Sequence, residues 1–175
     1  MFAARGLRRH DADEAVKEVL LREPEVVSAI RRQFGPTAVS EEGNVRRNIV
    51  ARHVFGDSGA LRWLEELLHP RLHVLWRQEF AKPGPPWIVE VPLLFEKNLE
   101  NWFDFTVCVT ADCAQQIRRL EQRGIPPELA RQRLAKQLPL ARKCELADFV
   151  LLNDGSLDFL RQQVDLLVGN LTPAV

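Results

Sequence analysis

The stretch W-I-V-E-V-P-L-L-F-E at residues 87–96 decides how the fold is interpreted. Its first half indicates a buried strand, because its β-branched residues follow the turn-forming K-P-G-P-P of residues 82–86. Pro92 ends that strand, since it has no N–H for a ladder bond and fixes its own φ. Two leucines, a phenylalanine and a carboxylate follow at the carboxyl end of the strand, where open parallel sheets bind ligands. An ordinary core strand followed by a plain loop explains the same residues equally well.

The length and composition suit a single globular domain. The chain has 175 residues, enough for a sizeable core. Lysine plus arginine and aspartate plus glutamate both number 24, and this balance excludes a global attraction to nucleic acid or anionic membranes. Cys108, Cys113 and Cys144 lack metal-ligand spacing and indicate free thiols in a reducing compartment. With neither a signal peptide nor an apolar run of about 18 residues, we expect a cytoplasmic protein.

The N-terminal residues indicate the end of a helix followed by a short strand. Gly6 has the position of a helix C-cap, and residues 7–10 have a strand pattern. Asp11 as N-cap and Glu14 at the third helical position form an acidic capping box, which opens the next helix.

Helical patterns then fill nearly all of residues 12–80, apart from a polar loop at 36–44, and no strand pattern occurs there. Ser58 is expected to cap a helix within this segment, and His69-Pro70 is expected to break that helix. The sequence therefore predicts an all-helical insertion between two strands and not a compact βα repeat.

Strands and helices alternate in the second half of the chain. Strand patterns occupy residues 105–110 and 148–153, and helical patterns occupy 112–123, 126–137, a short segment from 139 and a last segment from 156 onward. The last helix is expected to bury Leu157, Leu160, Val164, Leu167 and Val168. This alternation predicts an α/β fold with a parallel sheet and helices on both faces.

Two carboxylates follow the first strand at the point where chemistry is expected. Asp11 and Asp13 lie just after residues 7–10. One can cap the following helix while the other faces the cleft at the strand ends, where it could accept a hydroxyl proton or act through Mg²⁺. The alternative is that both are helix N-terminal acids favoured by the helix dipole.

The densest basic stretch lies on two helices joined by the Gly/Pro hinge G-I-P-P at residues 124–127. Its residues are Arg118, Arg119, Arg123, Arg131, Arg133, Lys136, Arg142 and Lys143. Such a pair of helices suits a lid over a polyphosphate, because guanidinium groups bind phosphate oxygens bidentately. A solvated face with alternating ion pairs is the competing interpretation, since Glu121 and Glu128 lie among the arginines.

Isolated polar residues leave further alternatives open. His69 could bind a ligand phosphate or cap a helix C-terminus. Asn153 ends a strand, where its amide could contact a purine edge or simply form a turn. The chain contains no H-E-x-x-H, C-x-x-C or G-x-S-x-G, so metalloprotease, redox and α/β-hydrolase interpretations have no motif behind them.

Together these motifs resemble the dephospho-CoA kinase family of P-loop kinases, and the resemblance covers essentially the whole chain. The matching motifs, in order, are F-A-A-R-G, D-A-D-E at residues 11–14, L-H-P at 68–70, V-P-L-L-F-E at 91–96, R-L-E-Q-R at 119–123, A-x-x-R-x-x-x-Q at 130–137, Lys143, Ala147-Asp148 and N-D-G at 153–155.

The resemblance implies a P-loop-kinase-like α/β fold that uses ATP with Mg²⁺ to phosphorylate the 3′-hydroxyl of dephospho-CoA. It implies one kinase-like domain over residues 1–175, with a helical CoA-binding insertion at 12–81 and a lid region at 112–145. Asp13 would be the catalytic carboxylate. The implied substrate-binding residues are Asp11, His69, Leu93, Leu94 and Glu96, and the implied ATP and lid residues are Arg119, Arg123, Arg133 and Asn153.

One family motif is missing from these residues. The family begins with a strand and G-x-x-x-x-G-K-[ST], whose amides, lysine and hydroxyl hold the phosphates and Mg²⁺. The nearest glycine cluster, residues 56–59, lacks the lysine and follows no strand. We therefore expect that about 20 residues are absent on family-type element lengths, that Met1 is an internal methionine, and that the central first strand is missing.

From this absence we expect low stability, open sheet edges that allow self-association, and little or no kinase activity. Two rival functions remain: another small-molecule kinase of the same superfamily, and a non-catalytic CoA- or nucleotide-binding protein. A structural fragment that binds nothing is the third alternative.

Overall fold

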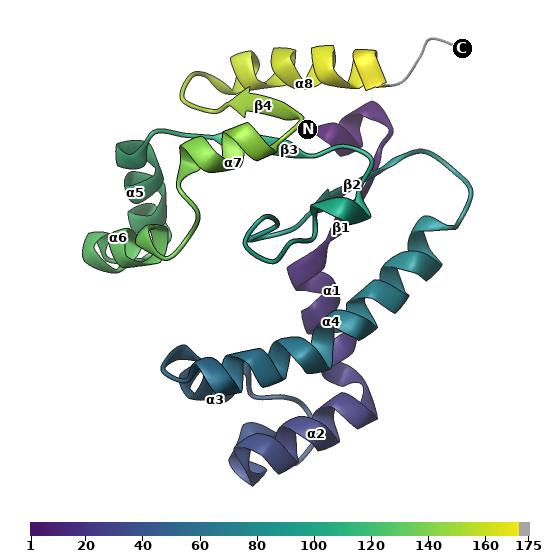
Figure 1. The fold of residues 1–175 in the computed structure, drawn as a ribbon, viewed down its shortest axis with the longest axis vertical. Coiled ribbons are helices and arrows are strands. Elements are labelled where there is room, and N and C mark those ends of the chain that lie inside the picture. The colour runs from purple at the N-terminus through teal and green to yellow at the C-terminus, as the bar shows by residue number, and fades with distance from the viewer. Residues whose placement is uncertain (172–175) are drawn as a thin grey trace. The chain divides into compact units, whose positions relative to one another are not determined.

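The computed structural model describes residues 1–171 (Figure 1). Its chain divides into two compact units. The helical unit is Leu7–Pro92, and the C-terminal unit joins Met1–Gly6 to the chain from Leu93 onward. Whether the protein acts as the single kinase-like domain expected from the sequence stays a prediction.

The helical unit contains two strands and most of the helices of the first half. Its elements are β1 (Arg8–Asp11), α1 (Ala12–Glu18), η2 (Leu20–Arg22), α2 (Pro24–Phe34), η3 (Pro36–Ala38), α3 (Arg47–Phe55), α4 (Ser58–Phe80) and β2 (Trp87–Glu90). Within residues 12–80 the only extended pairing is an isolated bridge between Val39 and Val45, so the expected helical character of this segment is confirmed.

The core of the helical unit forms where α2, α3 and α4 pack together. Val26 and Ile30 of α2 are fully buried. Val50 of α3 and Ala60 of α4 complete this buried cluster, and the partly buried Trp63 packs against it. The apolar spacing along each helix therefore supplies the packing that stabilises a segment with few strands.

Helix α4 differs from the sequence prediction at both expected boundaries. Asp57, and not Ser58, is its N-cap: its Oδ1 accepts the N–H groups of Gly59 at 2.8 Å and Ala60 at 3.1 Å. The predicted break at His69-Pro70 is wrong, because α4 continues through Pro70 to Phe80.

The residues after Pro70 keep the helix intact. Pro70 has no N–H for the carbonyl of Glu66, which normally costs stability in a helix interior. Leu72 is only 6% exposed and Trp76 is fully buried, so the helical continuation buries two large apolar side chains. Burial of that size offsets the loss of one backbone hydrogen bond.

The strands form two parallel pairs. In the helical unit β1 pairs with β2, in a register that places His10 opposite Val89 and Asp11 opposite Glu90. In the C-terminal unit β3 (Val107–Thr110) pairs with β4 (Phe149–Leu152). No third strand joins either pair within residues 1–171. The predicted α/β class with parallel strands is confirmed.

The C-terminal unit surrounds its strand pair with helices. The remaining elements are η1 (Phe2–Arg5), η4 (Glu100–Trp102), α5 (Cys113–Gln122), α6 (Pro127–Ala135), α7 (Leu140–Leu146) and α8 (Leu157–Leu171). The predicted C-cap at Gly6, with φ of 87°, is confirmed, although the turn before it is a 3-10 helix. Asp112 caps α5 by accepting the Gln115 N–H.

Helix α8 covers one face of the β3–β4 pair (Figure 1). Leu151 of β4 packs against Leu160, Val164 and Leu167 of α8, as the apolar stripe predicted. Leu157 is an exception, since it is 61% exposed at the first turn of the helix. Cys108 of β3 points to the opposite face, because side chains alternate along a strand. Among the described residues no helix is long and apolar enough to span a membrane.

Candidate active site

The parallel register gathers three carboxylates at the carboxyl ends of β1 and β2. Asp11 is the last residue of β1, and its strand partner is Glu90, the last residue of β2. Asp13 follows in the first turn of α1. Arg9 lies 3.0 Å from Asp11 and 3.5 Å from Glu90, so a single guanidinium neutralises part of this acidic cluster. The sequence identified Asp11 and Asp13 and missed Glu90, whose signal was its place at the end of the W-I-V-E strand.

The two aspartates have different environments. Asp11 caps α1, because its Oδ1 accepts the Glu14 N–H at 3.1 Å, as the capping box predicted. The exposed Asp13 carboxylate faces the charges of both Asp11 and Glu90. Partial burial, followed by the repulsion from these two groups, raises the pKa of Asp13 above 3.8. A carboxylate with a raised pKa is a better proton acceptor than an ordinary aspartate.

The oxygen donors of this cluster suit a hard cation such as Mg²⁺, which prefers carboxylates and phosphate oxygens. Among residues 1–171, however, no group of three or more His, Cys, Asp or Glu side chains is arranged to hold a metal ion. Within the described residues the cluster therefore offers carboxylate oxygens but no complete set of metal ligands.

A ring cluster supports the strand that carries these acids. The Nε2 atom of His10 accepts a hydrogen bond from the Trp76 indole N–H at 3.0 Å, and Phe80 and Trp87 pack edge-on against the His10 ring. Burial lowers the pKa of His10, although Glu79 and Asp11 oppose that shift. The hydrogen bond from Trp76 requires an unprotonated Nε2, so this bond and burial both favour the neutral form of His10, directly before Asp11.

The turn after β2 has unusual backbone geometry. Leu93 has φ of 57°, a left-handed conformation that is rare for a branched residue, and its carbonyl accepts the Lys97 N–H at 3.0 Å. The Leu94 carbonyl accepts the Leu99 N–H at 3.1 Å. Leu93 is 38% exposed. Such strain persists where the surrounding structure enforces it, and it concentrates at binding sites.

Glu96, at the end of this turn, is held by the segment between α6 and α7. Its Oε1 accepts the Leu138 N–H at 2.9 Å and lies 2.8 Å from the Lys143 ammonium. Lys143 also donates to Gln137 at 2.9 Å. The Lys143 and Glu96 side chains are only 19% and 15% exposed, so their ion pair is well screened from water.

These contacts decide the charge state of Glu96. Burial alone would raise its pKa, but the hydrogen bonds from Lys143 and from backbone N–H groups, including Leu138, lower the pKa below 4.5. Its Oε2 is buried and accepts no hydrogen bond from residues 1–171. One oxygen of Glu96 therefore holds the polypeptide, and the other retains its full capacity to accept a donor.

Two residues expected at the ATP site lie together at the carboxyl ends of β3 and β4. Arg119 of α5 donates to the carbonyl of Asn153 at 2.9 Å, and the Asn153 N–H donates to the Thr110 carbonyl at 2.9 Å. Nearby, the Asp112 N–H donates to Asp154 at 2.6 Å. The sequence predicted these residues separately, and the strand pairing brings them together.

The other predicted site residues have simpler surroundings. Arg123 is exposed at the C-cap of α5, and Arg133 is exposed in the last turn of α6. His69 lies within α4 and therefore caps no helix terminus. Its ring stacks with that of His73 at a centroid distance of 6.4 Å.

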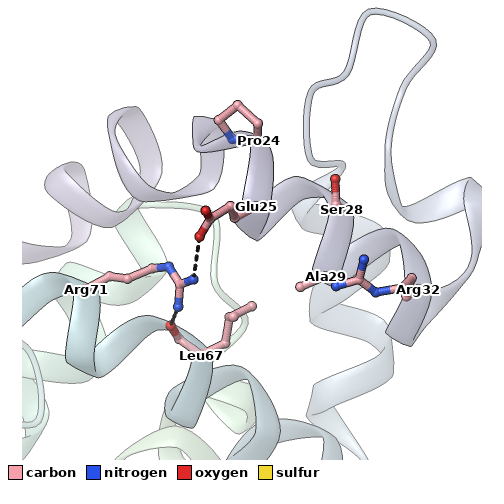
Figure 2. A pocket seen from close by; sticks show the side chains of 7 residues that line it. All are labelled: Pro24, Glu25, Ser28, Ala29, Arg32, Leu67 and Arg71. Atoms are coloured by element: carbon pink, nitrogen blue, oxygen red, sulfur yellow. Dashed lines mark hydrogen bonds and ion pairs between the residues drawn. The ribbon is translucent and has the colours of Figure 1, made fainter.

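A hollow of about 490 Å³ lies between α2 and α4 in the helical unit (Figure 2). Arg71 points into it and pairs with Glu23 and Glu25, each at 3.3 Å. The same guanidinium donates to the Leu67 carbonyl at 2.9 Å. Because Arg71 is occupied by these partners, this hollow offers less to a phosphate than its arginine content suggests.

Comparisons with known proteins agree on one family. The family model for dephospho-CoA kinase (CoaE) matches residues 1–158. A dephospho-CoA kinase from Synechococcus elongatus is 33% identical over 167 residues, which cover 94% of this chain and 80% of that protein. One from Symbiobacterium thermophilum is 38% identical over 160 residues, covering 89% of this chain and 67% of that protein.

Solved structures agree with the fold. The crystal structure of TT1252 from Thermus thermophilus matches with a TM-score of 0.84 and 32% identity, covering 98% of this chain and 88% of that one. The dephospho-CoA kinase from Campylobacter jejuni matches with a TM-score of 0.71 and 23% identity, and the match covers 97% of this chain and 87% of that one. The latter supports the fold alone.

By fold and site, the protein is an α/β protein with acidic and basic side chains at the carboxyl ends of its parallel strands. The family match makes the assignment specific: the chain belongs to the dephospho-CoA kinase family, whose members are ATP-binding transferases of coenzyme A biosynthesis. The resemblance drawn from the sequence motifs is confirmed.

Proposed function

We propose that this protein transfers the γ-phosphoryl group of ATP to the 3′-hydroxyl of dephospho-CoA. The observation that carries this proposal is Asp13, a carboxylate in the first turn of α1, directly after β1, whose pKa is raised by burial and by the adjacent Asp11 and Glu90. In the reaction, the 3′-oxygen forms a bond to the γ-phosphorus as the bond to the ADP oxygen breaks. Asp13 accepts the hydroxyl proton.

The proposed acceptor site consists of Asp11, His69, Leu93, Leu94 and Glu96. The strained Leu93 turn supports a binding role for the segment after β2. The unoccupied Oε2 of Glu96 can accept a hydroxyl or amine donor of the bound molecule. In this proposal the helical insertion over residues 12–81 binds the CoA moiety.

The proposed donor site uses the basic helices. Arg119, Arg123 and Arg133 neutralise the ATP phosphates, residues 112–145 form the lid, and Asn153 lies near the adenine. The exposure of Arg123 and Arg133 supports this assignment, because exposed guanidinium groups keep their donors available for phosphate. Mg²⁺ arriving with ATP would take oxygen ligands from the acidic cluster and reduce the charge of the transferring group.

The chain 1–175 itself is proposed to be impaired, because it contains no G-x-x-x-x-G-K-[ST] to hold ATP. Within residues 1–171 the outer edges of the β1–β2 and β3–β4 pairs have no strand partner, which supports lowered stability and self-association. We place the protein in the cytoplasm. A non-catalytic CoA- or nucleotide-binding protein is the alternative that the missing phosphate-binding motif favours.

The deciding experiment measures ATP-dependent phosphorylation of dephospho-CoA and of a panel of nucleoside monophosphates, together with calorimetric binding of dephospho-CoA. Both the chain 1–175 and any longer chain encoded in frame upstream of Met1 are assayed. Turnover specific for dephospho-CoA in the longer chain supports the proposal. Turnover of a nucleoside monophosphate instead would assign another kinase of the superfamily. Binding without turnover in every form would assign the non-catalytic alternative.

The stability part of the proposal has its own test. Any chain that carries a further strand before Met1 should melt at a higher temperature than the chain 1–175, because that strand would pair with strand edges that have no partner within residues 1–171. Equal melting temperatures would contradict this part while leaving the enzymatic assignment untouched.

A further inference from the structure

Lys143 belongs to the densest basic stretch, which suits a lid over phosphates, but its ammonium is held by other groups. Its Nζ lies 2.8 Å from Oε1 of Glu96 and donates to the side-chain oxygen of Gln137 at 2.9 Å. The Lys143 side chain is only 19% exposed, whereas those of Arg131 and Arg142 in the same stretch are 59% and 56% exposed. A buried ammonium that already holds two oxygens has little capacity left for a phosphate of ATP.

The partner of Lys143 has one oxygen that the fold does not use. Oε1 of Glu96 accepts both the Lys143 ammonium and the Leu138 N–H, the latter at 2.9 Å. Oε2 is buried, and no donor within residues 1–171 reaches it. Buried carboxylate oxygens are nearly always hydrogen-bonded, because an unmade bond is costly. The arrangement therefore indicates a donor group that a bound molecule supplies.

The charge of the Glu96–Lys143 pair matters for the kind of molecule that can bind there. Dephospho-CoA, the proposed acceptor, contains a diphosphate and is an anion, which an unpaired carboxylate in its site would repel. Lys143 brings the net charge of the pair to zero and leaves Oε2 as a hydrogen-bond acceptor. Because both side chains are largely screened from water, this neutralisation acts at close range and is weakly screened.

We propose that Lys143 is a positioning residue of the acceptor site, which neutralises and orients Glu96 so that Oε2 accepts an O–H or N–H group of the bound anion. Lys143 acts through Glu96 and contacts no phosphate of ATP. This inference rests on the proposed function, since it uses the assignment of Glu96 to the acceptor site. It removes Lys143 from the groups on which ATP binding depends.

The experiment compares acceptor binding with ATP use. Calorimetry measures the affinity of the chain 1–175 for dephospho-CoA without ATP, and steady-state kinetics measures KM for each substrate in the longest polypeptide that the gene encodes. Lys143→Met should weaken dephospho-CoA binding and raise its KM by about 10–100-fold, because the acceptor then meets a bare, unpositioned carboxylate. KM for ATP should not change.

Two double variants separate positioning from a merely structural role. Glu96→Gln with Lys143→Met is neutral and keeps an oxygen acceptor, so it should recover most of the affinity that Lys143→Met loses. Glu96→Leu with Lys143→Met is also neutral but has no acceptor, so it should not recover that affinity. Arg161→Met is the charge control, since it removes a cation from an exposed ion pair with Asp158 in α8 and should leave both KM values unchanged.

The outcomes distinguish this inference from the proposed function. If the parent binds and phosphorylates dephospho-CoA but Lys143→Met has unchanged affinity, or if both double variants recover equally, the inference is overturned and the proposed function is unaffected. A higher KM for ATP in Lys143→Met that Glu96→Gln does not reverse would also overturn it. A parent that binds no dephospho-CoA overturns both. Circular dichroism checks folding, and the two double variants decide the matter if Lys143→Met alone is unfolded.

Discussion

Asp13 of the helical unit and two acidic side chains of the C-terminal unit, Glu96 and Asp148, have pKa shifts of opposite direction. In the helical unit, Asp13 lies beside two further carboxylates, and its pKa is raised. In the C-terminal unit, Glu96 is paired with Lys143, and Asp148 accepts hydrogen bonds from the Thr106 N–H and hydroxyl, each at 2.7 Å. The pKa values of Glu96 and Asp148 are both lowered.

This difference separates acids that stabilise the fold from acids available for chemistry. A carboxylate whose charge is matched by a lysine or by hydrogen-bond donors lowers the free energy of the folded state. A carboxylate held beside like charges raises that free energy and persists where function requires it. By this criterion Asp13 is the candidate catalytic group, while Glu96 has a structural role through one of its two oxygens.

The largest expected effect tests the chemical side of this comparison. Asp13→Asn removes the proton acceptor and should lower kcat for phosphoryl transfer by about 10²–10⁴-fold, measured in the longest polypeptide that the gene encodes. Asp104→Asn is the matched control, since Asp104 is an exposed carboxylate of the C-terminal unit. A similar loss in both variants, or in neither, would remove the distinction between the two kinds of acid.

A variant of Lys143 tests whether the ion pair with Glu96 stabilises the folded state. Lys143→Met leaves the buried Glu96 carboxylate without its cation and should lower the free energy of unfolding by about 1–3 kcal/mol, measured by urea denaturation. The lowered pKa of Glu96 means that its stabilisation is present above pH 4.5 and is lost as the pH falls through the folded-state pKa. The difference in the free energy of unfolding between Lys143→Met and the parent protein should therefore become smaller at acidic pH.

A surface pair provides the control for that variant. Arg131 and Glu128 are 3.5 Å apart and both exposed, so Arg131→Met should cost less than about 0.5 kcal/mol. The double variant Glu96→Gln with Lys143→Met should be more stable than Lys143→Met alone, because it no longer buries an unpaired charge. Additive losses would show that the two side chains do not interact.

A smaller effect is expected at His10. The hydrogen bond from Trp76 requires an unprotonated Nε2, and burial lowers the pKa of His10 below 6.5. The unfolded chain therefore takes up the proton first, so stability is present above pH 6.5 and is lost as the pH falls below it. We expect a loss of about 1 kcal/mol, the worth of one hydrogen bond, when tryptophan fluorescence follows urea unfolding at successive pH values.

The His10→Gln variant distinguishes the loss of stability caused by protonation of His10 from losses caused by other titrating groups. A glutamine oxygen can accept the Trp76 N–H at any pH, so the variant should lose part of the pH dependence and retain the part due to His73, whose pKa is also lowered, chiefly by burial. An unchanged pH profile in His10→Gln would assign the whole effect to other groups.

The smallest expected effect is the change in stability caused by replacing Asp13. Because its pKa is raised, the stability associated with Asp13 is present below its ordinary value of 3.8 and is lost as the pH rises through the folded-state pKa. Asp13→Asn should therefore stabilise the helical unit at neutral pH, by less than about 1 kcal/mol since the group is exposed and screened by solvent. A destabilised variant at neutral pH would show that Asp13 has an unrecognised structural role.

Many of the helix boundaries could be predicted from the sequence, because a helix cap depends on residues that are adjacent in the chain. The capping box at Asp11 and the C-cap at Gly6 depend on a few adjacent residues. The α4 boundaries were predicted wrongly for the same reason. Whether a helix continues past Pro70 depends on what Trp76 meets in the folded unit, and that information is not local.

The sequence by itself determined the α/β class, most element boundaries, the family and the two aspartates after β1. Periodicity, caps and ordered motifs carry that information along the chain. Only the tertiary structure placed Glu90 opposite Asp11 and joined Lys143 to Glu96. Each of these contacts links residues far apart in the chain, so it follows from strand register and helix packing, which adjacent residues do not specify.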